Sequence, residues 1–338
     1  MSGELFGIGT FSAADGKPFP GLTFIDGVLP VRSFAGKHQA KSVHPEGWES
    51  VQGILESWPS TFEALRGIVQ GRAAVAQQLI PLASLRVHAP VPKPGTVYCS
   101  GANYRKHVVE LILAHQGNDA TRNMTPEETR SWGMHLMDER ARSGTPFVFV
   151  KPQSAVTGPF DPIAVPDAAE KPDWELELAV VIGKRARRVS RANALEYVAG
   201  YTIANDITLR SKVFRRQGDS PELGMDFVLA KGAPGFLPLG PYIVPAAFVP
   251  DPQKLRLTLK LNGQVMQDED TADMIFTVAH LIEYLSAGVE LLPGDVICTG
   301  SPAGNGAHYG RFIQDGDVLE SSITGLGLQR NRCVHDRL

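Results

Sequence analysis

The chain has 338 residues, of which 43% are hydrophobic and 20% charged, a composition typical of a globular protein rather than a long disordered chain. Its formal net charge of −3 gives no field that would collect phosphates, and no dense Lys/Arg run is interleaved with aromatic residues, so nucleic acid is not an expected partner. The apolar stretches are shorter than the about 20 residues that a membrane-spanning helix needs, so we expect a cytoplasmic protein with no membrane partner.

Residues 1–90 combine strand-like runs with one helical segment. Turn signals at Asp15-Gly16 and Asp26-Gly27 separate the first strands, and the second signal predicts a tight hairpin. Ser60-Thr61-Phe62-Glu63 then predicts a capping box at the start of a helix. The proline-rich run 89–95 favours extended backbone and reads as a linker. We therefore expect residues 1–90 to form a small N-terminal α+β domain.

Residues 95–338 carry many short β-branched and aromatic runs cut by Gly and Pro, which predicts a second region that is mostly β-structure. Ser190 is expected to cap a helix that ends at Gly200, and Thr277 one that ends at Gly288. The fold class predicted for the whole chain is α+β, mainly β.

A helical excursion is expected at about residues 111–145. Thr125-Pro126-Glu127-Glu128 forms a capping box with proline at the first helical position, and Gly144 is the expected stop. A surface insertion would be tolerated there, because long loops add little closure entropy. The segment begins beside His107 and Glu110, so a lid over a site is the other interpretation.

Two acids open an apolar strand. Glu175 and Glu177 are separated by one residue, so in a strand they project from the same face. Exposure on an amphipathic strand is the ordinary explanation, but residues 179–182 are apolar on both faces and indicate an interior strand. Two buried carboxylates side by side require a proton or a cation.

A third acid has a similar setting. Asp206 lies in the β-rich run 201–208, where an unpaired carboxylate would be costly. Three oxygen ligands from rigid strands, without His or Cys, favour Mg²⁺ or Mn²⁺ over zinc. Water and substrate would complete the coordination shell.

His107 and Glu110 are three residues apart and share one face of a helical turn. Glu110 can therefore orient the imidazole while His107 takes a proton from water, although a lone histidine is more often structural. Lys231 follows an apolar run and precedes a Gly/Pro-rich bend, which suits a pocket position as well as a surface one.

The cysteine pattern predicts buried reduced thiols rather than disulfides. The three residues are odd in number, widely spaced and set in apolar runs. They are Cys99, Cys298 and Cys333.

An ordered series of motifs, from about Val97 to Val334, resembles the fumarylacetoacetate hydrolase family. The matching segments are Gly101 to Glu110 (G-x-N-Y-x-x-H-x-x-E), Phe149 to Ala155 (F-x-K-P-x-S-A), Glu175 to Glu177, Gly200 to Arg210, Asn262 to Gln267, Thr271 to Met274, Pro293 to Ile297 and Thr299 to Gly304. Each motif is short, but their common order makes the resemblance specific.

The resemblance implies a mixed β-sandwich roll, usually a homodimer, with its site at one end. It also implies that Glu175, Glu177 and Asp206 bind Mg²⁺ or Mn²⁺, which chelates a small 2-keto acid. His107 and Glu110 would activate water, and Lys231 would steady developing negative charge. Four further positions resemble substrate-facing residues: Tyr104, Lys151, Arg210 and Thr299.

The function that the resemblance implies is hydrolysis of a carbon–carbon bond in an acylpyruvate or other 2,4-diketo acid. The family also contains decarboxylases, hydratases and isomerases, and a metal-binding homologue without turnover is a further alternative. Three departures from the family pattern fall at substrate-facing positions: Val213 replaces a glutamine, Asn305 replaces an apolar residue, and the insertion after Glu110 is long.

Overall fold

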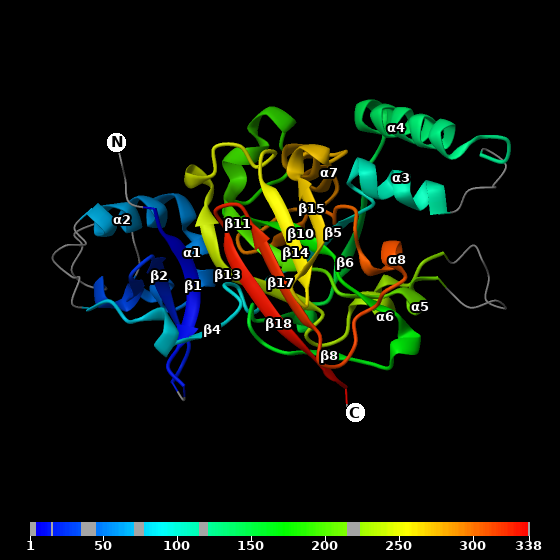
Figure 1. The fold of residues 1–338 in the computed structure, drawn as a ribbon. Helices are drawn as coiled ribbons and strands as arrows, with labels where there is room; N and C mark the ends of the chain where they lie inside the picture. The colour runs from blue at the N-terminus through cyan, green and yellow to red at the C-terminus, as the bar shows by residue number, and fades with distance from the viewer. Residues whose placement is uncertain are drawn as a thin grey trace.

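The computed structural model describes residues 5–14, 16–34, 45–70, 78–114, 121–214 and 224–336. These residues form an α+β fold dominated by two mixed sheets, which confirms the predicted fold class (Figure 1). Asp15 lies outside the described residues, so the predicted turn at Asp15-Gly16 does too. No described helix is long and apolar enough to cross a membrane.

The larger sheet has the strand order β3-β2-β1-β13-β11-β10-β16-β5-β6, with β4 beside β1 and β7 beside β13. Most neighbours are antiparallel, whereas β16 and β5 run parallel, as do β13 and β7. The strands are β1 (Gly7–Ser12), β2 (Phe19–Phe24), β3 (Gly27–Pro30), β4 (Arg86–Val87), β5 (Val97–Gly101), β6 (Phe147–Lys151), β7 (Val156–Thr157), β10 (Leu176–Ile182), β11 (Val198–Asn205), β13 (Leu237–Pro245) and β16 (Val296–Cys298).

The smaller sheet has the order β15-β14-β17-β18-β8, and β9 pairs separately with β12. In Figure 1 its yellow and red strands cross in front of the green strands of the larger sheet. Apolar residues of both sheets share one core, and Gln329 Nε2 bridges the layers by donating to the Ile203 carbonyl at 2.9 Å. The strands of the smaller sheet are β8 (Ile163–Val165), β14 (Arg256–Leu261), β15 (Gln264–Asp270), β17 (Val318–Ile323) and β18 (Gly327–His335). The separate pair consists of β9 (Pro172–Asp173) and β12 (Thr208–Leu209).

The N-terminal region continues the larger sheet. The predicted hairpin at Asp26-Gly27 is confirmed by the pairing of β2 with β3, in which Phe24 lies opposite Gly27. Strand β1 pairs with β13 at Ile8 and Ile243, so this region and the rest of the chain share a sheet. The expected boundary between two domains at residues 90–95 therefore stays a prediction, because strands from both sides of it belong to one sheet.

The described α-helices lie mostly outside the sheets (Figure 1). The caps predicted for two of them are confirmed: Thr125 and Glu128 form the capping box of α4, and Thr277 caps α7. The helices are α1 (Val51–Glu56), α2 (Trp58–Gln70), α3 (Arg105–Ala114), α4 (Pro126–Ser143), α5 (Arg210–Val213), α6 (Phe227–Lys231), α7 (Val278–Gly288) and α8 (Gly306–Tyr309).

Two helix predictions are wrong in part: a helix is present at each place, but its start, type or end differs. The capping box predicted at Ser60 to Glu63 lies inside α2, where the Ser60 hydroxyl donates to the Ser57 carbonyl at 3.0 Å. The helix predicted from Ser190 to Gly200 is a 3₁₀ helix, η7 (Arg191–Tyr197), followed by β11. Gly200 is not a helix cap: a Cβ there would lie 2.3 Å from the Val244 carbonyl, so glycine allows β11 to approach β13.

The predicted helical excursion contains the end of α3 and all of α4, which pack against each other at the upper right of Figure 1. Arg140 of α4 anchors it to the body by donating to the Ala102 carbonyl at 2.8 Å, and its guanidinium lies 5.3 Å from the Phe276 ring centre. Helix α4 is thus docked through specific contacts rather than extended into solvent.

Candidate metal centre and adjoining cavity

Three predicted metal ligands meet where β10 begins and the neighbouring antiparallel strand β11 ends. Glu175 precedes β10, Glu177 lies within it, and Asp206 follows β11. The antiparallel register aligns Leu176 with Asn205, and the Asp206 amide donates to the Glu175 carbonyl at 2.8 Å. One carboxylate oxygen from each of the three acids lies within 4.8 Å of the others, and all three residues are buried.

Two lysines neutralise part of this charge. Lys231 Nζ lies 2.5 Å from Glu175 Oε2 and 2.5 Å from Asp206 Oδ2. Lys151 Nζ lies 2.5 Å from Asp206 Oδ1 and donates to the Phe236 carbonyl at 2.6 Å. Burial opposes the charged form of Lys231, yet the carboxylates of Asp206 and Glu175 hold its pKa above the ordinary value. Lys231 therefore stays an ammonium group inside the site.

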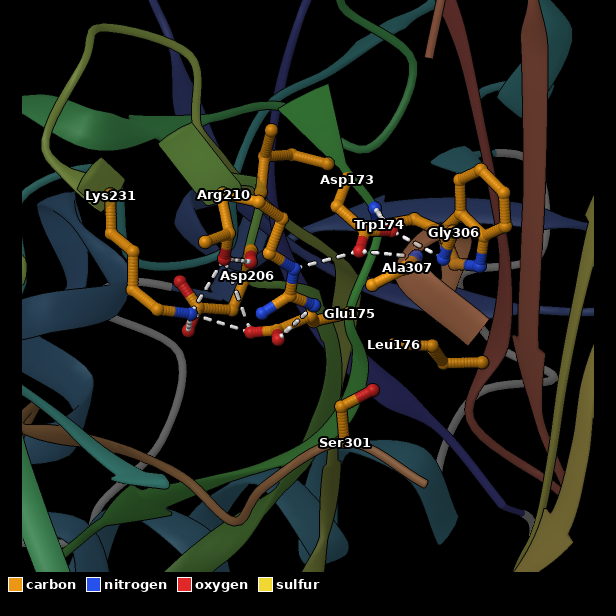
Figure 2. A network of polar contacts seen from close by, with 12 residues as sticks. Asp173, Trp174, Glu175, Leu176, Asp206, Arg210, Lys231, Ser301, Gly306 and Ala307 are labelled. Carbon is orange, nitrogen blue, oxygen red and sulfur yellow. Dashed lines mark hydrogen bonds and ion pairs between the residues drawn. The ribbon is translucent and has the colours of Figure 1, made fainter. Parts of the chain in front are cut away.

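Arg210 joins the acidic group to a second buried acid. Its Nη2 lies 2.7 Å from Glu175 Oε1, and its Nε donates to Asp173 Oδ2 at 2.8 Å. Figure 2 shows Arg210 between these two carboxylates. Burial opposes ionisation of Glu175, but Arg210 and Lys231 hold the pKa of its carboxyl below its usual range. Glu175 therefore remains a carboxylate.

Asp173 fixes the start of α8 to this network. Its Oδ1 accepts hydrogen bonds from the Gly306 amide at 2.5 Å and the Trp174 amide at 2.8 Å, while Oδ2 accepts from the Ala307 amide at 3.0 Å (Figure 2). A Cβ on Gly306 would lie 2.6 Å from Asp173 Oδ1, so glycine permits the approach. The Asp173 side chain thus sets the loop and Arg210 relative to one another.

Glu177 is the member of the group that lacks a cationic partner among the described residues. Its Oε2 accepts a hydrogen bond from the Gly300 amide at 2.7 Å. Burial and the nearby Cys298, Asp206 and Glu175 raise the pKa of the Glu177 carboxyl well above its usual range. A hard divalent cation between three carboxylate oxygens would offset this repulsion, so the donor set and its charge fit such an ion.

His107 and Glu110 lie on α3, but no hydrogen bond or ion pair joins their side chains in the described part of the chain. His107 faces the cavity beside the carboxylates, and burial lowers the pKa of its imidazole to about 4. Glu110 turns to α8 instead, where its Oε2 lies 3.2 Å from His308 Nδ1. Both residues lie on α3, as their spacing predicted. The Glu110 carboxylate, however, pairs with His308 of α8 instead of His107.

A cavity of ≈ 540 Å³ opens in front of the acidic group. Of the predicted catalytic and substrate-facing residues, His107, Lys231 and Arg210 line it. Val213 and Asn305, two of the three departures from the family pattern, line it as well.

The other predicted substrate-facing residues lie behind the cavity lining. Tyr104 and Thr299 are fully buried, and the Thr299 hydroxyl donates to the Leu178 carbonyl at 2.9 Å. The Lys151 side chain is also fully enclosed, against Asp206. This placement suits support of the wall and of Asp206 better than contact with a substrate.

Two site residues were missed by sequence reasoning. Asp173 stands next to the Trp174-Glu175 pair, and its burial in a mainly apolar neighbourhood was the available signal. His308 gave none, because only tertiary packing brings it to Glu110. The predicted free, buried cysteines are confirmed at all three positions.

Comparisons with known proteins match most of the chain. The family model described as fumarylacetoacetate (FAA) hydrolase C-terminal matches residues 96–334. The mitochondrial oxaloacetate tautomerase FAHD2A of Bos taurus is 34% identical over 274 residues, which cover 80% of this chain and 77% of that protein.

Solved structures are similar over nearly the whole chain. Maleylpyruvate hydrolase from Sphingobium sp. SYK-6, in complex with manganese(II) and pyruvate, is 27% identical with a TM-score of 0.70, covering 98% of this chain and 100% of that one. The 2-hydroxyhepta-2,4-diene-1,7-dioate isomerase of Mycobacterium marinum is 27% identical with a TM-score of 0.65, covering 99% and 100%.

Proposed function

Because this chain belongs to the fumarylacetoacetate hydrolase family, we propose that it is a divalent-metal-dependent hydrolase that cleaves a carbon–carbon bond in an acylpyruvate or related 2,4-diketo acid. The observation that carries the proposal is the convergence of Glu175, Glu177 and Asp206 beside a cavity that also exposes His107. An electron sink and a base would then face the same substrate.

Glu175, Glu177 and Asp206 would hold Mg²⁺ or Mn²⁺. The manganese in the similar maleylpyruvate hydrolase supports a divalent ion of this kind. Bound there, the ion supplies Lewis-acid polarisation of the keto oxygen of a 2-keto acid.

The chain's own residues have distinct roles in the proposed reaction. Neutral His107 removes a proton from water, and the hydroxide adds to the acyl carbon. The bond between that carbon and the methylene carbon breaks, which releases the acyl group as a carboxylic acid and passes the electron pair into the enolate of pyruvate. The proton taken up by His107 then converts the enolate to pyruvate. Lys231 stabilises negative charge on the oxygens, and Arg210 offers its guanidinium to the substrate carboxylate.

Glu110 is proposed to act on His107 only after leaving His308, since no hydrogen bond or ion pair joins the two residues of the predicted dyad in the described structure. This separation favours a second candidate, tautomerisation or isomerisation of a 2-keto acid. That reaction needs a base and an electron sink but no activated water. The oxaloacetate tautomerase among the relatives supports the same alternative.

A panel of 2-keto acids with Mg²⁺ or Mn²⁺ separates these functions. Hydrolysis predicts loss of the enol absorbance of an acylpyruvate together with equal amounts of pyruvate and a new carboxylic acid. Enol–keto exchange without either product would replace hydrolysis with tautomerisation, and CO₂ without a new acid would identify a decarboxylase. Metal binding without any conversion would identify a non-catalytic homologue.

The oligomeric state of the protein and its cellular compartment are also proposals. The family resemblance supports a homodimer. The sequence supports the cytoplasm, whereas the mammalian relatives carry the word mitochondrial in their names. Sedimentation of the purified chain and imaging of the protein in its own cell would test the two points.

A further inference from the structure

Three phenylalanines form one wall of the cavity. Phe147 and Phe149 alternate on the edge strand β6, and Phe227 begins α6. The rings of Phe149 and Phe227 are stacked, with centres 4.4 Å apart and planes inclined by 15°, and the Phe147 ring lies 5.8 Å from that of Phe227. All three rings line the cavity.

This aromatic wall stands directly beside the proposed reaction centre. The Lys231 ammonium lies 5.2 Å from the Phe149 ring centre and 5.9 Å from that of Phe227. A group that extends from a substrate held at the acidic cluster and Lys231 would therefore meet ring faces first. Such faces attract apolar and aromatic groups and give a carboxylate no hydrogen-bond donor.

More apolar side chains extend this wall towards the surface. Phe214, Met225 and Leu111 line the same cavity, although they are 70%, 42% and 38% exposed. Large apolar side chains that remain exposed together, rather than in the core, mark binding surfaces. The cavity of ≈ 540 Å³ falls within the about 300–1,000 Å³ of pockets that enclose ligands much larger than pyruvate.

We infer that the substrate is a 2-keto acid with an aryl or alkyl tail, which binds against Phe147, Phe149 and Phe227, rather than one with a second carboxylate. The inference rests on the proposed function for the position of the keto-acid end. The proposed tail differs from the compounds in the names of three relatives, oxaloacetate, maleylpyruvate and a heptadienedioate, each of which carries two carboxylates.

Lys171 would favour a substrate with a second carboxylate over one with an apolar tail. It lines the cavity, and its ammonium lies 5.9 Å from the Phe312 ring centre. A carboxylate tail directed to this exposed lysine would form an ion pair in contact with solvent. Burial of an apolar tail on that wall is the larger effect, because an exposed ion pair contributes little in water.

Binding of two non-cleavable 2-keto acids tests the inference. Calorimetry with the Mn²⁺-loaded full chain is expected to show phenylpyruvate binding at least about tenfold more tightly than 2-oxoglutarate, a difference of about 1.4 kcal/mol. Equal affinities, or tighter binding of 2-oxoglutarate, would overturn the inference. Neither ligand has the 4-keto group that hydrolysis requires, so the comparison does not depend on turnover.

Phe147→Lys replaces an apolar part of the wall with a cation and should reverse the preference. Phe160→Lys is the matched control, since Phe160 is 46% exposed and lies outside the cavity lining. A Phe147→Lys protein that keeps the wild-type preference would contradict the assignment. If that variant does not fold, Phe227→Leu keeps apolar volume and should narrow the difference by roughly threefold or more; an unchanged ratio would equally count against the wall.

Turnover distinguishes failure of the tail assignment from failure of the proposed function. If fumarylpyruvate is cleaved faster than benzoylpyruvate and phenylpyruvate binds weakly, hydrolysis stands and the apolar tail is refuted. If no 2,4-diketo acid is cleaved but phenylpyruvate binds tightly, the apolar tail stands and hydrolysis is refuted.

Discussion

Two buried regions of this protein are held together by different forces. The N-terminal apolar cluster, which includes Ile8, Ile54 and Leu65, packs apolar side chains from α1 and α2 against β1 and other strands of the larger sheet. The acidic centre buries Asp173, Glu175, Glu177 and Asp206 among Lys151, Arg210 and Lys231. Four carboxylates there face three cations, so the centre is one positive charge short of formal neutrality.

This difference predicts different responses to substitution. Removing atoms from an apolar cluster costs stability in proportion to the lost contacts and the cavity left behind. Removing one charge from the acidic centre leaves its partner buried and unbalanced, and it also alters the site at which a substrate would bind. Substitutions in the first region should therefore change unfolding, and those in the second should change turnover.

The largest effect is expected for Glu177→Gln, which removes a proposed metal ligand with little change of shape. Loss of Lewis-acid stabilisation worth several kcal/mol should lower kcat/KM by roughly 10³-fold in a steady-state assay with the best diketo acid. Glu196→Gln, on an exposed residue of η7, is the matched control. A Glu177→Gln enzyme within tenfold of wild type would show that this carboxylate is not needed.

Lys231→Met should have the next largest effect, roughly 10²-fold on kcat, because it removes the ammonium that faces developing negative charge. Mn²⁺ affinity should be retained or increased, since Glu175 and Asp206 lose a competing cation. Kinetics and Mn²⁺ titration on one preparation would check both expectations. Lys254→Met, at a side chain 79% exposed, is the control. Loss of Mn²⁺ binding in the Lys231 variant would contradict this role.

Asp173→Asn should lower kcat by about tenfold while Mn²⁺ binding persists, because the carboxylate positions Arg210 and the α8 loop without facing the reaction itself. Since Arg210 is then less well oriented, KM for the 2-keto acid should rise as well. Asp173→Glu should not restore activity, because the carboxylate already lies 2.5 Å from the Gly306 amide and an added methylene would displace it. Unchanged kcat and KM in Asp173→Asn would refute the positioning role.

The smallest effect on turnover is expected for Ile54→Ala in the N-terminal apolar cluster. Deleting this fully buried side chain should cost about 2–5 kcal/mol of unfolding free energy, measured in urea. The folded variant should keep kcat/KM within about twofold, because residues packed away from the site are not part of its charge balance. A large loss of kcat in Ile54→Ala, with an unchanged free energy of unfolding, would show that the N-terminal apolar cluster affects turnover as the acidic centre does.

The sequence predicted features that depend on neighbours along the chain. Alternation in a strand placed Glu175 and Glu177 together, and the punctuation at Thr125 and Thr277 identified the starts of α4 and α7. Each signal acts within a few residues, so no knowledge of tertiary contacts was needed.

Features that depend on distant partners were harder to predict. Glu110 is close enough in sequence to serve His107, but His308 of α8 competes for it. Gly200 resembles a helix stop, whereas its real constraint is the Val244 backbone of a neighbouring strand. Lys151 belongs to a motif of the family, yet its burial against Asp206 follows from packing that no motif describes.

A manganese titration decides whether the acidic centre is a metal site. Titration of Mn²⁺ monitored by electron paramagnetic resonance should show one site per wild-type chain, loss of that site in Glu175→Ala, and an intact site without turnover in His107→Ala. This result would separate the carboxylates, which hold the ion, from the imidazole, which acts on the substrate. Wild-type Mn²⁺ affinity in Glu175→Ala, or equal loss in both variants, would contradict the account.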